Sequence, residues 1–386
     1  MVLIDELQIS RQAGIAQLIV LNMDTYRPAA AKIGITLLLW LAVMPADGAV
    51  IFMYHHFGRS DLPSTNVRLE QFEGHLEYLQ RAGYQIMPLE EIVQSLRQHR
   101  PLPDRSVAIT IDDAYLSVYT EAYPRLRRRH WPFTVFTATD PVDHHFPAFM
   151  NWQQMREMQQ HGASFANHSS HHEHLIRQRS GESRQQWRAR IRQDIHHAQQ
   201  RLRTELGQSP MLFAYPYGEY NRDLAELVTG MGFTAFGQQS GAIGASSDWR
   251  SLPRYPMSES FAGLADFRLK AASLALPVVD VMPWDPELSV DRRPLMTITL
   301  ADSDAQLPQL SCYVSGQGAV APHWLQAKRR FAVQAHAALP PGRSRYNCTA
   351  PSARSDRYYW FSHLWILPPA LPKSSSEGLP VTAPQH

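Results

Sequence analysis

The sequence has little of several features that would mark a particular class of protein. Its 386 residues include two cysteines, and 37 Lys and Arg residues nearly balance 35 Asp and Glu residues, which leaves a formal net charge of +2. No block of basic residues interleaved with aromatic ones is present, so the sequence predicts no nucleic-acid partner. With 44% hydrophobic and 19% charged residues, the composition instead predicts a globular protein long enough for two domains.

A long hydrophobic run is also absent. The apolar stretch 33–43 is shorter than the roughly 20 residues of a membrane-spanning helix. It follows a basic flank and precedes small residues up to Gly48, an order typical of a secretory signal peptide cleaved after that glycine. Because the segment has ordinary signal-peptide proportions only when counted from Met23, we expect 1–48 to be an N-terminal extension with a signal peptide at 23–48. The protein is then secreted or periplasmic; a buried helix or a retained membrane anchor is the alternative.

Strand and helix patterns alternate from residue 49 to about residue 277. Short apolar or β-branched runs bounded by turns predict strands, and apolar residues three to four apart predict helices. Repeated strand and helix units with short connections are typical of a parallel sheet, either a barrel or an open doubly wound sheet. The expected strands are 49–54, 107–111, 133–136, 163–167, 212–215 and 234–236, and the expected helices are 69–82, 119–129, 152–161, 184–206 and 222–231.

The pattern then changes to β-rich segments separated by turns, which predicts a small all-β, sandwich-like domain over 283–368. Cys312 and Cys348 both lie there and would form a disulfide if the protein is exported. The aromatic residues within 358–365 either pack its core or form a sugar-stacking surface. The Pro- and Ser-rich residues 369–386 predict a disordered tail. The expected strands of this domain are 295–300, 310–314, 330–335 and 358–367.

Two of the predicted strands end in side chains that can bind a metal. The strand 107–111 runs directly into Asp112 and Asp113, and a later strand runs into His168, with His172 four residues on. Because the carboxyl ends of parallel strands meet at one rim, we expect these side chains to lie together. On a single helical turn both histidines would face the same way and, with one carboxylate, would bind a divalent metal. The other carboxylate would act as a base.

These motifs resemble those of the polysaccharide deacetylase family, carbohydrate esterase family 4. Residues 109–114, Ile-Thr-Ile-Asp-Asp-Ala, are similar to its Thr-Phe-Asp-Asp-Gly motif, and residues 168–172, His-Ser-Ser-His-His, to its His-Ser/Thr-x-x-His motif. Residues 213–218, Phe-Ala-Tyr-Pro-Tyr-Gly, resemble its Arg-x-Pro-Tyr/Phe motif. The resemblance extends over 49–279 and looks closest to the secreted bacterial branch that acts on poly-N-acetylglucosamine-type polymers. It implies an α/β fold, a distorted (β/α)7 barrel, which we expect at 49–282.

The resemblance also implies roles for individual residues. Asp112 would be the catalytic base, and Asp113, His168 and His172 would be the metal ligands. The backbone N–H of Tyr217 would help to stabilise the developing oxyanion. Zinc is the expected ion, although cobalt, nickel and manganese also accept two imidazoles and a carboxylate.

Two departures from the family pattern concern supporting residues. Ala214 stands where the family usually has an Arg that orients the catalytic Asp; Arg254 is the candidate replacement, and an ordinary surface or core-edge arginine is the alternative reading of that residue. The family motif Leu-x-x-His, whose His acts as general acid, has no match between Tyr255 and Pro283. His55, at the end of the first predicted strand, is the best substitute.

The sequence therefore predicts a metal-dependent hydrolase that removes N-acetyl groups from a β-linked N-acetylglucosamine polysaccharide and acts as a monomer. An O-acetyl polysaccharide esterase would use the same site with less need of a general acid. A non-catalytic carbohydrate-binding protein is favoured by Ala214 and by the missing Leu-x-x-His motif, but a base beside three metal ligands opposes it. The other histidines near the motifs, His56, His171 and His174, are expected to support the site or to face solvent.

Overall fold

The computed structural model describes residues 45–46, 48–289 and 291–368, which all belong to one compact unit. Most of the predicted signal peptide and all of the predicted tail lie outside these residues. Among the described residues, no helix is both long and apolar enough to cross a membrane.

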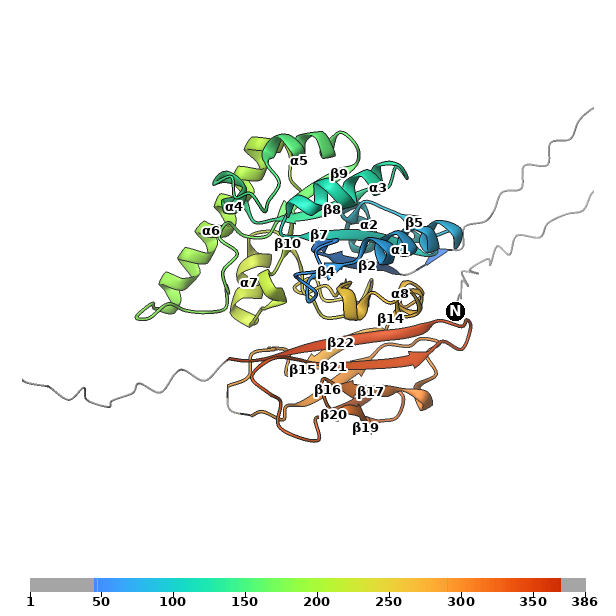
Figure 1. The fold of residues 1–386 in the computed structure, drawn as a ribbon. Coiled ribbons are helices and arrows are strands. Elements are labelled where there is room, and N and C mark those ends of the chain that lie inside the picture. Colours follow the sequence, from blue (N-terminus) through green and yellow to red (C-terminus); the bar gives the residue numbers. More distant parts are fainter. Residues whose placement is uncertain (1–44, 47, 290, 369–386) are drawn as a thin grey trace, which may run out of the picture. The chain divides into compact units, whose positions relative to one another are not determined.

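A curled, mostly parallel sheet forms the first part of the described chain (Figure 1). Its strand order is β11, β10, β9, β8, β7, β2, β12, with β5 paired to β7 and β13 paired to β2. Only β12 is antiparallel to its neighbour within this sheet. The strands are β2 (Gly48–Tyr54), β5 (Gln85–Ile86), β7 (Ser106–Asp112), β8 (Phe133–Thr137), β9 (Ala163–Asn167), β10 (Leu212–Ala214), β11 (Thr234–Phe236), β12 (Ala242–Gly244) and β13 (Tyr255–Pro256).

Helices connect these strands and cover both faces of the sheet, which explains why the central strands are continuous apolar runs. Alternate residues of β2 enter different cores: Phe52 packs with Phe72 of the first helix, and Ile51 packs with Ile92 of the second. The helices are α1 (Leu69–Arg81), α2 (Leu89–Arg97), α3 (Tyr123–Arg127), α4 (Thr139–Asp143), α5 (Trp152–Gln159), α6 (Arg184–Leu206), α7 (Arg222–Gly230) and α8 (Leu264–Ala271), with a π-helical turn η1 (Val118–Ala122) and 3-10 turns η2 (Pro216–Gly218), η3 (Glu259–Phe261) and η4 (Leu307–Gln309).

The two edges of the curled sheet approach each other through the segment 252–256. The N–H of Leu252 donates to the Ala235 carbonyl, and the Gly237 N–H donates to the Leu252 carbonyl. Strand β13, in the same segment, pairs with β2. The fold is therefore a mixed α/β arrangement with a curled half-barrel sheet, as the alternation of strands and helices predicted.

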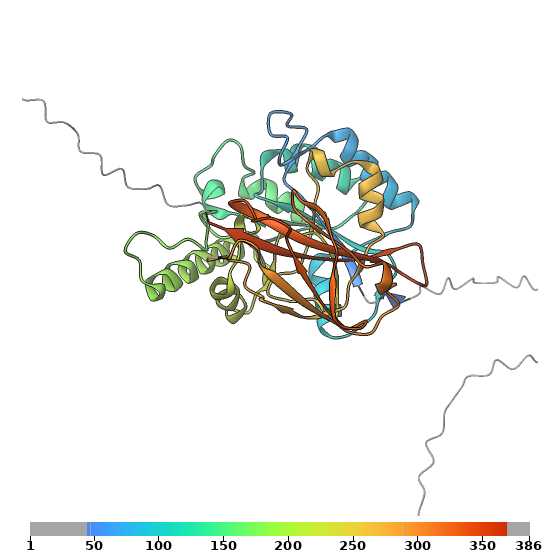
Figure 2. The same ribbon diagram turned by 90° about the horizontal axis from the view of Figure 1, so that it is seen from below.

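Two further sheets follow in the chain, drawn in orange and red in Figures 1 and 2. One has the order β14, β22, β21, β17, β18 and the other the order β15, β16, β20, β19. Their strands are β14 (Leu274–Ala275), β15 (Val278–Met282), β16 (Leu295–Leu300), β17 (Ser311–Val314), β18 (Gly318–Val320), β19 (His323–Gln326), β20 (Arg330–Gln334), β21 (Gly342–Pro351) and β22 (Tyr358–Leu367). Two short pairs complete the described strands: β1 (Pro45–Ala46) with β6 (Leu102–Pro103), and β3 (His56–Phe57) with β4 (Asn66–Val67).

The predicted disulfide is present between these C-terminal strands. Cys312 on β17 lies directly opposite Cys348 on β21, and the two sulfur atoms are bonded. Of the aromatic side chains, Trp365 is buried in the core between the sheets, while Tyr358 is 42% exposed. Part of this aromatic run therefore packs a core, as one of the two readings of the sequence expected.

One predicted helix has a different form. The expected helix 119–129 is a π-helical turn followed by the short helix α3. Pro124, at the start of α3, has no N–H to continue a regular ladder, and the N–H of Tyr123 donates instead to the carbonyl of Val118, five residues back.

Candidate functional site

The candidate site lies at the carboxyl ends of three strands of the curled sheet. His55 follows β2, Asp112 ends β7 and His168 follows β9. Strands β2 and β7 run in parallel with Tyr54 opposite Ile111, so the residues that follow them emerge at the same rim.

Asp113, His168 and His172 form a cluster with the geometry of a metal site. Asp113 Oδ1 lies 3.3 Å from His168 Nε2 and 3.0 Å from His172 Nε2. One ligand atom of each residue lies within 4.8 Å of the others, and no other group of three or more His, Cys, Asp or Glu among the described residues does this. Two imidazoles and a carboxylate on a divalent ion leave open positions for water and substrate.

The polar atoms of this cluster fit a cation. His168 Nδ1 lies 2.7 Å from the Ala214 carbonyl oxygen. Because a carbonyl only accepts, Nδ1 carries the proton and Nε2 presents its lone pair to Asp113. Within the described part of the chain, neither Asp113 Oδ1 nor His168 Nε2 has a hydrogen-bond partner, and both are buried. Two buried acceptors that face each other are costly unless positive charge lies between them.

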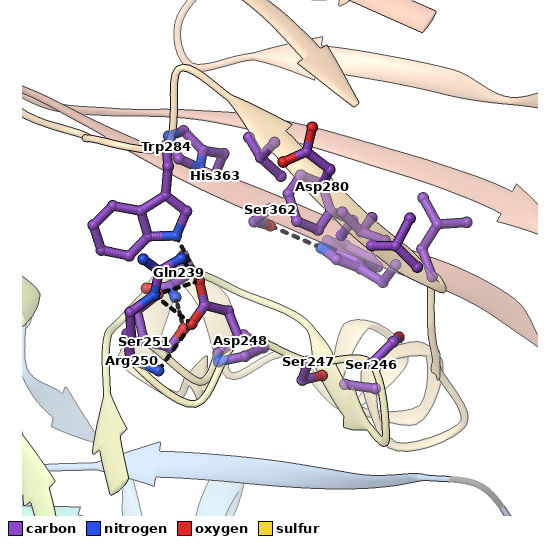
Figure 3. A pocket seen from close by; sticks show the side chains of 18 of the residues that line it. Gln239, Ser246, Ser247, Asp248, Arg250, Ser251, Asp280, Trp284, Ser362 and His363 are labelled. Carbon is purple, nitrogen blue, oxygen red and sulfur yellow. Dashed lines mark hydrogen bonds and ion pairs between the residues drawn. The ribbon is translucent and has the colours of Figure 1, made fainter. Parts of the chain in front are cut away.

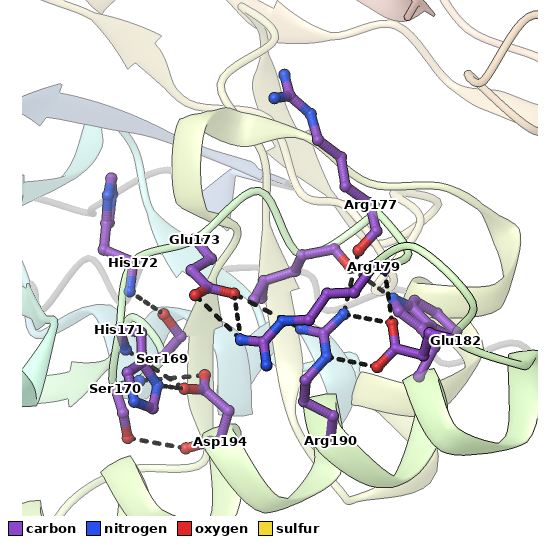
Figure 4. A network of polar contacts seen from close by, with 12 residues as sticks. Ser169, Ser170, His171, His172, Glu173, Arg177, Arg179, Glu182, Arg190 and Asp194 are labelled. Atoms are coloured by element: carbon purple, nitrogen blue, oxygen red, sulfur yellow. Dashed lines mark hydrogen bonds and ion pairs between the residues drawn. The ribbon is translucent and has the colours of Figure 1, made fainter. Parts of the chain in front are cut away.

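The two histidines do not share a helical turn, and that part of the sequence prediction is wrong. The chain from His168 to His172 is irregular, and Ser169 and His172 have positive φ angles of 68° and 54°. The Ser169 N–H donates to Asn167 Oδ1 at 2.9 Å. The His172 N–H donates to Ser169 Oγ at 3.0 Å (Figure 4). Such local side-chain hydrogen bonds compete with helix formation. Here they produce a tight turn that brings both imidazoles to Asp113.

Asp112 is held by Arg254 in a fully buried ion pair. The two guanidinium Nη atoms donate to the two carboxylate oxygens at 2.7 and 2.8 Å, and both side chains are 0% exposed. Arg254 Nε donates to the Gly237 carbonyl at 3.0 Å. Burial raises the pKa of Asp112, but the charges of Arg254, His168 and His55 outweigh it and hold the pKa below its usual range. Arg254 thus has the contacts that a replacement for the missing family arginine requires.

His55 lies at the same rim, next to Asp112. Its Nε2 atom is 3.9 Å from Asp112 Oδ2, and its side chain is 15% exposed. Burial lowers the pKa of His55, although Asp112 and Asp113 act in the opposite direction. The position agrees with that expected for a proton donor, and the role stays a prediction.

Tyr217 lies in the turn η2 beside His172, one of the two histidines of the metal-site cluster. Its φ angle is +60°, and its ring stacks on His174 with a centroid distance of 4.0 Å and approaches His172 at 4.6 Å. The hydrogen bonds of the turn use the N–H groups of Gly218 and Glu219. Neither of these bonds uses the N–H of Tyr217.

The sequence motifs did not reveal several supporting residues. Asp194, from the middle of α6, accepts from the Ser170 N–H and contacts His171 Nδ1 (Figure 4). His171 Nε2 lies 3.1 Å from Asp140 Oδ2. The one signal in the sequence is that Asp194 falls on the apolar face of α6, at helical spacing from Ile191 and Ala198. His171 and its partners therefore hold the turn that carries the metal-type histidines.

The sequence motifs also did not reveal one aromatic and one acidic neighbour of the site, Tyr115 and Glu219. Tyr115 stacks on His56 with ring centroids 3.7 Å apart. Glu219, which is 8% exposed, lies 2.7 Å from His174 Nδ1. No spacing rule links these residues to the motifs, because each comes from the chain that follows a motif rather than from the motif itself. His56 and His174 thus lie in supporting positions, as expected.

A cavity of about 280 Å³ lies apart from these residues, between the chain around β12 and the strands β15 and β22 (Figure 3). Its lining includes Trp284, Asp248, Arg250 and His363. Arg250 and the Trp284 indole both donate to Asp248, so these two charged side chains of the lining are paired with each other. None of the predicted site residues lines this cavity.

Comparisons with known proteins agree with the motifs. Residues 99–236 match the sequence profile of the family described as Polysaccharide deacetylase. The chain is 26% identical over 247 residues to a poly-β-1,6-N-acetyl-D-glucosamine N-deacetylase of Escherichia coli (strain K12), which covers 54% of this chain and 36% of that protein. It is 24% identical over 213 residues to an enzyme of the same name from Staphylococcus aureus (strain MRSA252), which covers 54% of this chain and 73% of that protein. The chain thus matches only about a third of the length of the first of these relatives.

A solved structure shows the same fold. A deacetylase of Streptococcus pyogenes in complex with acetate superposes with a TM-score of 0.53 at 22% identity. The match covers 59% of this chain and 99% of that one, so a large part of this chain has no counterpart in the solved structure.

Proposed function

We propose, from the match of residues 99–236 to the polysaccharide deacetylase profile, that the protein is a metal-dependent hydrolase that removes N-acetyl groups from a β-linked N-acetylglucosamine polysaccharide. One observation carries the proposal. A carboxylate held by a buried arginine, Asp112 with Arg254, lies beside a separate cluster of one carboxylate and two imidazoles. A protein that only bound sugars would have no need of a base next to three potential metal ligands.

Asp113, His168 and His172 are the residues that would hold the ion, with zinc as the first candidate and cobalt, nickel or manganese as others. When bound, such an ion would lower the pKa of water at the site and polarise the acetamide carbonyl. Asp112 then has the position of a general base, because Arg254 occupies both of its oxygens with directed hydrogen bonds and keeps it ionised.

The remaining residues act on the substrate as its C–N bond breaks. The N–H of Tyr217 would donate to the oxyanion that develops from the acetamide carbonyl. His55 would deliver a proton to the leaving amine, since it lies at the same rim and within 3.9 Å of Asp112. The products are acetate and a polymer with a free amine.

The relatives are named for β-1,6-linked poly-N-acetylglucosamine, which supports the same linkage for the substrate of this chain. We therefore propose this linkage first.

We also propose that the protein is secreted or periplasmic, with a signal peptide at 23–48, and that it acts as a monomer. The C-terminal sheets would form an accessory domain. The pairing of β14 with β22 and of β15 with β16 supports a start for this domain near residue 274 in place of residue 283, and we propose that bound.

The contacts of the segment 252–256 bear on whether the curled sheet closes into a barrel. The segment 252–256 bonds to both edges of the curled sheet. We propose that the sheet is the distorted (β/α)7 barrel that the family resemblance implies, closed by this segment.

The test is acetate release by the full chain from β-1,6-linked N-acetylglucosamine oligomers, with added zinc or cobalt and with the Asp112→Asn variant as control. Metal-dependent release that the variant loses is the expected result. O-acetylated xylan, assayed in parallel, separates the alternative of an O-acetyl esterase. Release from xylan alone would select the esterase, and release from neither substrate by metal-loaded protein would favour a carbohydrate-binding role.

A further inference from the structure

Two arginines of the C-terminal strand β21 reach the turn that carries Tyr217 and the neighbouring residue Gln238. Arg343 Nη1 donates to the Tyr217 carbonyl and lies 3.5 Å from Gln238 Oε1. Arg345 Nη2 donates to the Gln238 carbonyl at 3.1 Å. Because the two arginines are two residues apart on one strand, both project from the same face of the sheet.

The strand that supplies these arginines is fixed to the core under the turn. Arg343 pairs in the β21–β22 ladder with Ile366. Ile366 and Leu364 of β22 pack in one apolar cluster with Phe213 and Tyr215, the residues that lead into the turn. The turn and the strand that carries the two arginines therefore pack on the same apolar cluster, and this packing restricts movement of the turn relative to the strand.

The turn itself needs support from outside. Tyr217 and Gly218 have consecutive positive φ angles of 60° and 69°, a conformation that a tyrosine seldom adopts. A Cβ atom on Gly218 would lie 2.6 Å from the Gln238 Cβ atom, so the turn packs directly on Gln238. Gln238 is the same residue whose backbone and side chain Arg345 and Arg343 contact.

We propose that Arg343 and Arg345 are positioning residues, which fix the turn so that the Tyr217 N–H points at the reacting carbonyl. The C-terminal sheets would then be a working part of the catalytic unit and not a separate module. The inference rests on the proposed function, because the Tyr217 N–H has a task only if an oxyanion forms. An exposed hydrogen bond such as that of Arg343 adds little to stability. The effect of its loss should therefore appear in the rate and not in folding.

The experiment compares the Arg343→Ala, Arg345→Ala double variant with Arg343→Lys and with Arg330→Ala. Arg330 is a matched control, because it is an exposed arginine on a strand, β20, of the other C-terminal sheet. We expect kcat for acetate release to fall about 10- to 100-fold in the double variant, with KM changed less than about threefold and bound metal unchanged. Arg343→Lys should lose part of the rate, since an ammonium lacks the guanidinium fork.

Hydrogen exchange at the Gly218 and Glu219 amides gives a readout that does not depend on activity. Their N–H groups make the hydrogen bonds of the turn, and we expect exchange at least about tenfold faster in the double variant and unchanged exchange in Arg330→Ala. A kcat equal to that of Arg330→Ala, or unchanged exchange, would overturn the proposal. If the wild type releases no acetate, the proposed function fails, whereas the exchange result still decides whether β21 holds the turn. Should the double variant not fold, Arg343→Lys carries both measurements.

Discussion

The rim of the curled sheet and the core of the C-terminal sheets are equally buried, but different side chains fill them. At the rim, Asp112, Arg254 and His168 are at most 1% exposed and are ionisable. Between the C-terminal sheets lie aromatic and aliphatic side chains such as Tyr346 and Trp365, together with a disulfide. Burying charge costs free energy that an apolar core of similar volume would not. The rim is thus arranged for chemistry at the expense of stability.

Metal removal should give the largest effect, and it should fall on the rim alone. Treatment with a chelator is expected to lower acetate release at least ~100-fold, because the ion supplies several kcal/mol of transition-state stabilisation. Added zinc or cobalt should restore the rate. The described residues of the C-terminal sheets include no group of His, Cys, Asp or Glu that could hold a metal ion, so the stability of these sheets should not change. Full activity in protein shown to be metal-free would contradict this division.

Loss of Arg254 should destabilise the rim most. In Arg254→Ala the buried carboxylate of Asp112 has no counter-ion, so the free energy of unfolding should fall by about 3–5 kcal/mol, and acetate release should fall with it. Urea denaturation and kcat measure the two effects. Arg59→Ala is the control, because Arg59 forms the same two-point contact with Asp61 in solvent and should leave both quantities unchanged. Equal free energies of unfolding and equal kcat values for the two variants would refute the role of Arg254 as the counter-ion that holds Asp112.

Breaking the disulfide should act on the other region. The bond between Cys312 and Cys348 closes a loop with a sequence separation of 36 residues, for which loop-closure entropy predicts a loss of roughly 3–4 kcal/mol in the Cys312→Ser, Cys348→Ser variant. Denaturation midpoints with and without reductant measure this loss in the wild type. The metal content of the folded variant should stay at the wild-type value. A fall in metal content would contradict this prediction, because it would show that the C-terminal sheets influence metal binding at the rim.

The pH dependence of stability gives the smallest effect and compares the regions directly. Burial lowers the pKa of His75, in the core under the curled sheet, and of His363, on β22, to about 4. Both imidazoles are neutral when folded, so their contribution is complete above pH 6.5 and is lost as the pH falls from 6.5 to 4. Each should cost at most about 3 kcal/mol over that window. His75→Gln and His363→Gln should each flatten the decline, as followed by thermal unfolding, and a decline identical to that of the wild type would refute the assignment.

The long, strongly patterned elements were predictable from the sequence. Helix α6 spans Arg184–Leu206 and strand β9 spans Ala163–Asn167, as the periodicity indicated. Strand β21 was missed, because its outward positions carry charged and polar residues and its inward positions include Ser344, so its alternation is weakly hydrophobic. Helix α8 was missed because only Phe267 and Ala271 of its eight residues are buried.

The site divides in the same way. Residues at strand ends, such as Asp112 and His168, could be placed at one rim from the chain alone, because parallel strands all deliver their carboxyl ends there. The turn at Ser169 could not, since its shape depends on side-chain hydrogen bonds and positive φ angles. Contacts between distant segments, such as that of Arg343 with Tyr217, could not be predicted either, because no sequence motif includes both residues.

We propose that the two adjacent carboxylates, Asp112 and Asp113, have different roles, and metal content measured together with activity tests this most directly. Purified wild type, Asp112→Asn and Asp113→Asn would be loaded with zinc, dialysed, and assayed for zinc per chain and acetate release. We predict one ion per chain in Asp112→Asn with kcat lowered about 10²- to 10⁴-fold, and little or no ion and no activity in Asp113→Asn. An Asp113→Asn variant that keeps its zinc and its rate, or an Asp112→Asn variant with wild-type activity, would contradict the account.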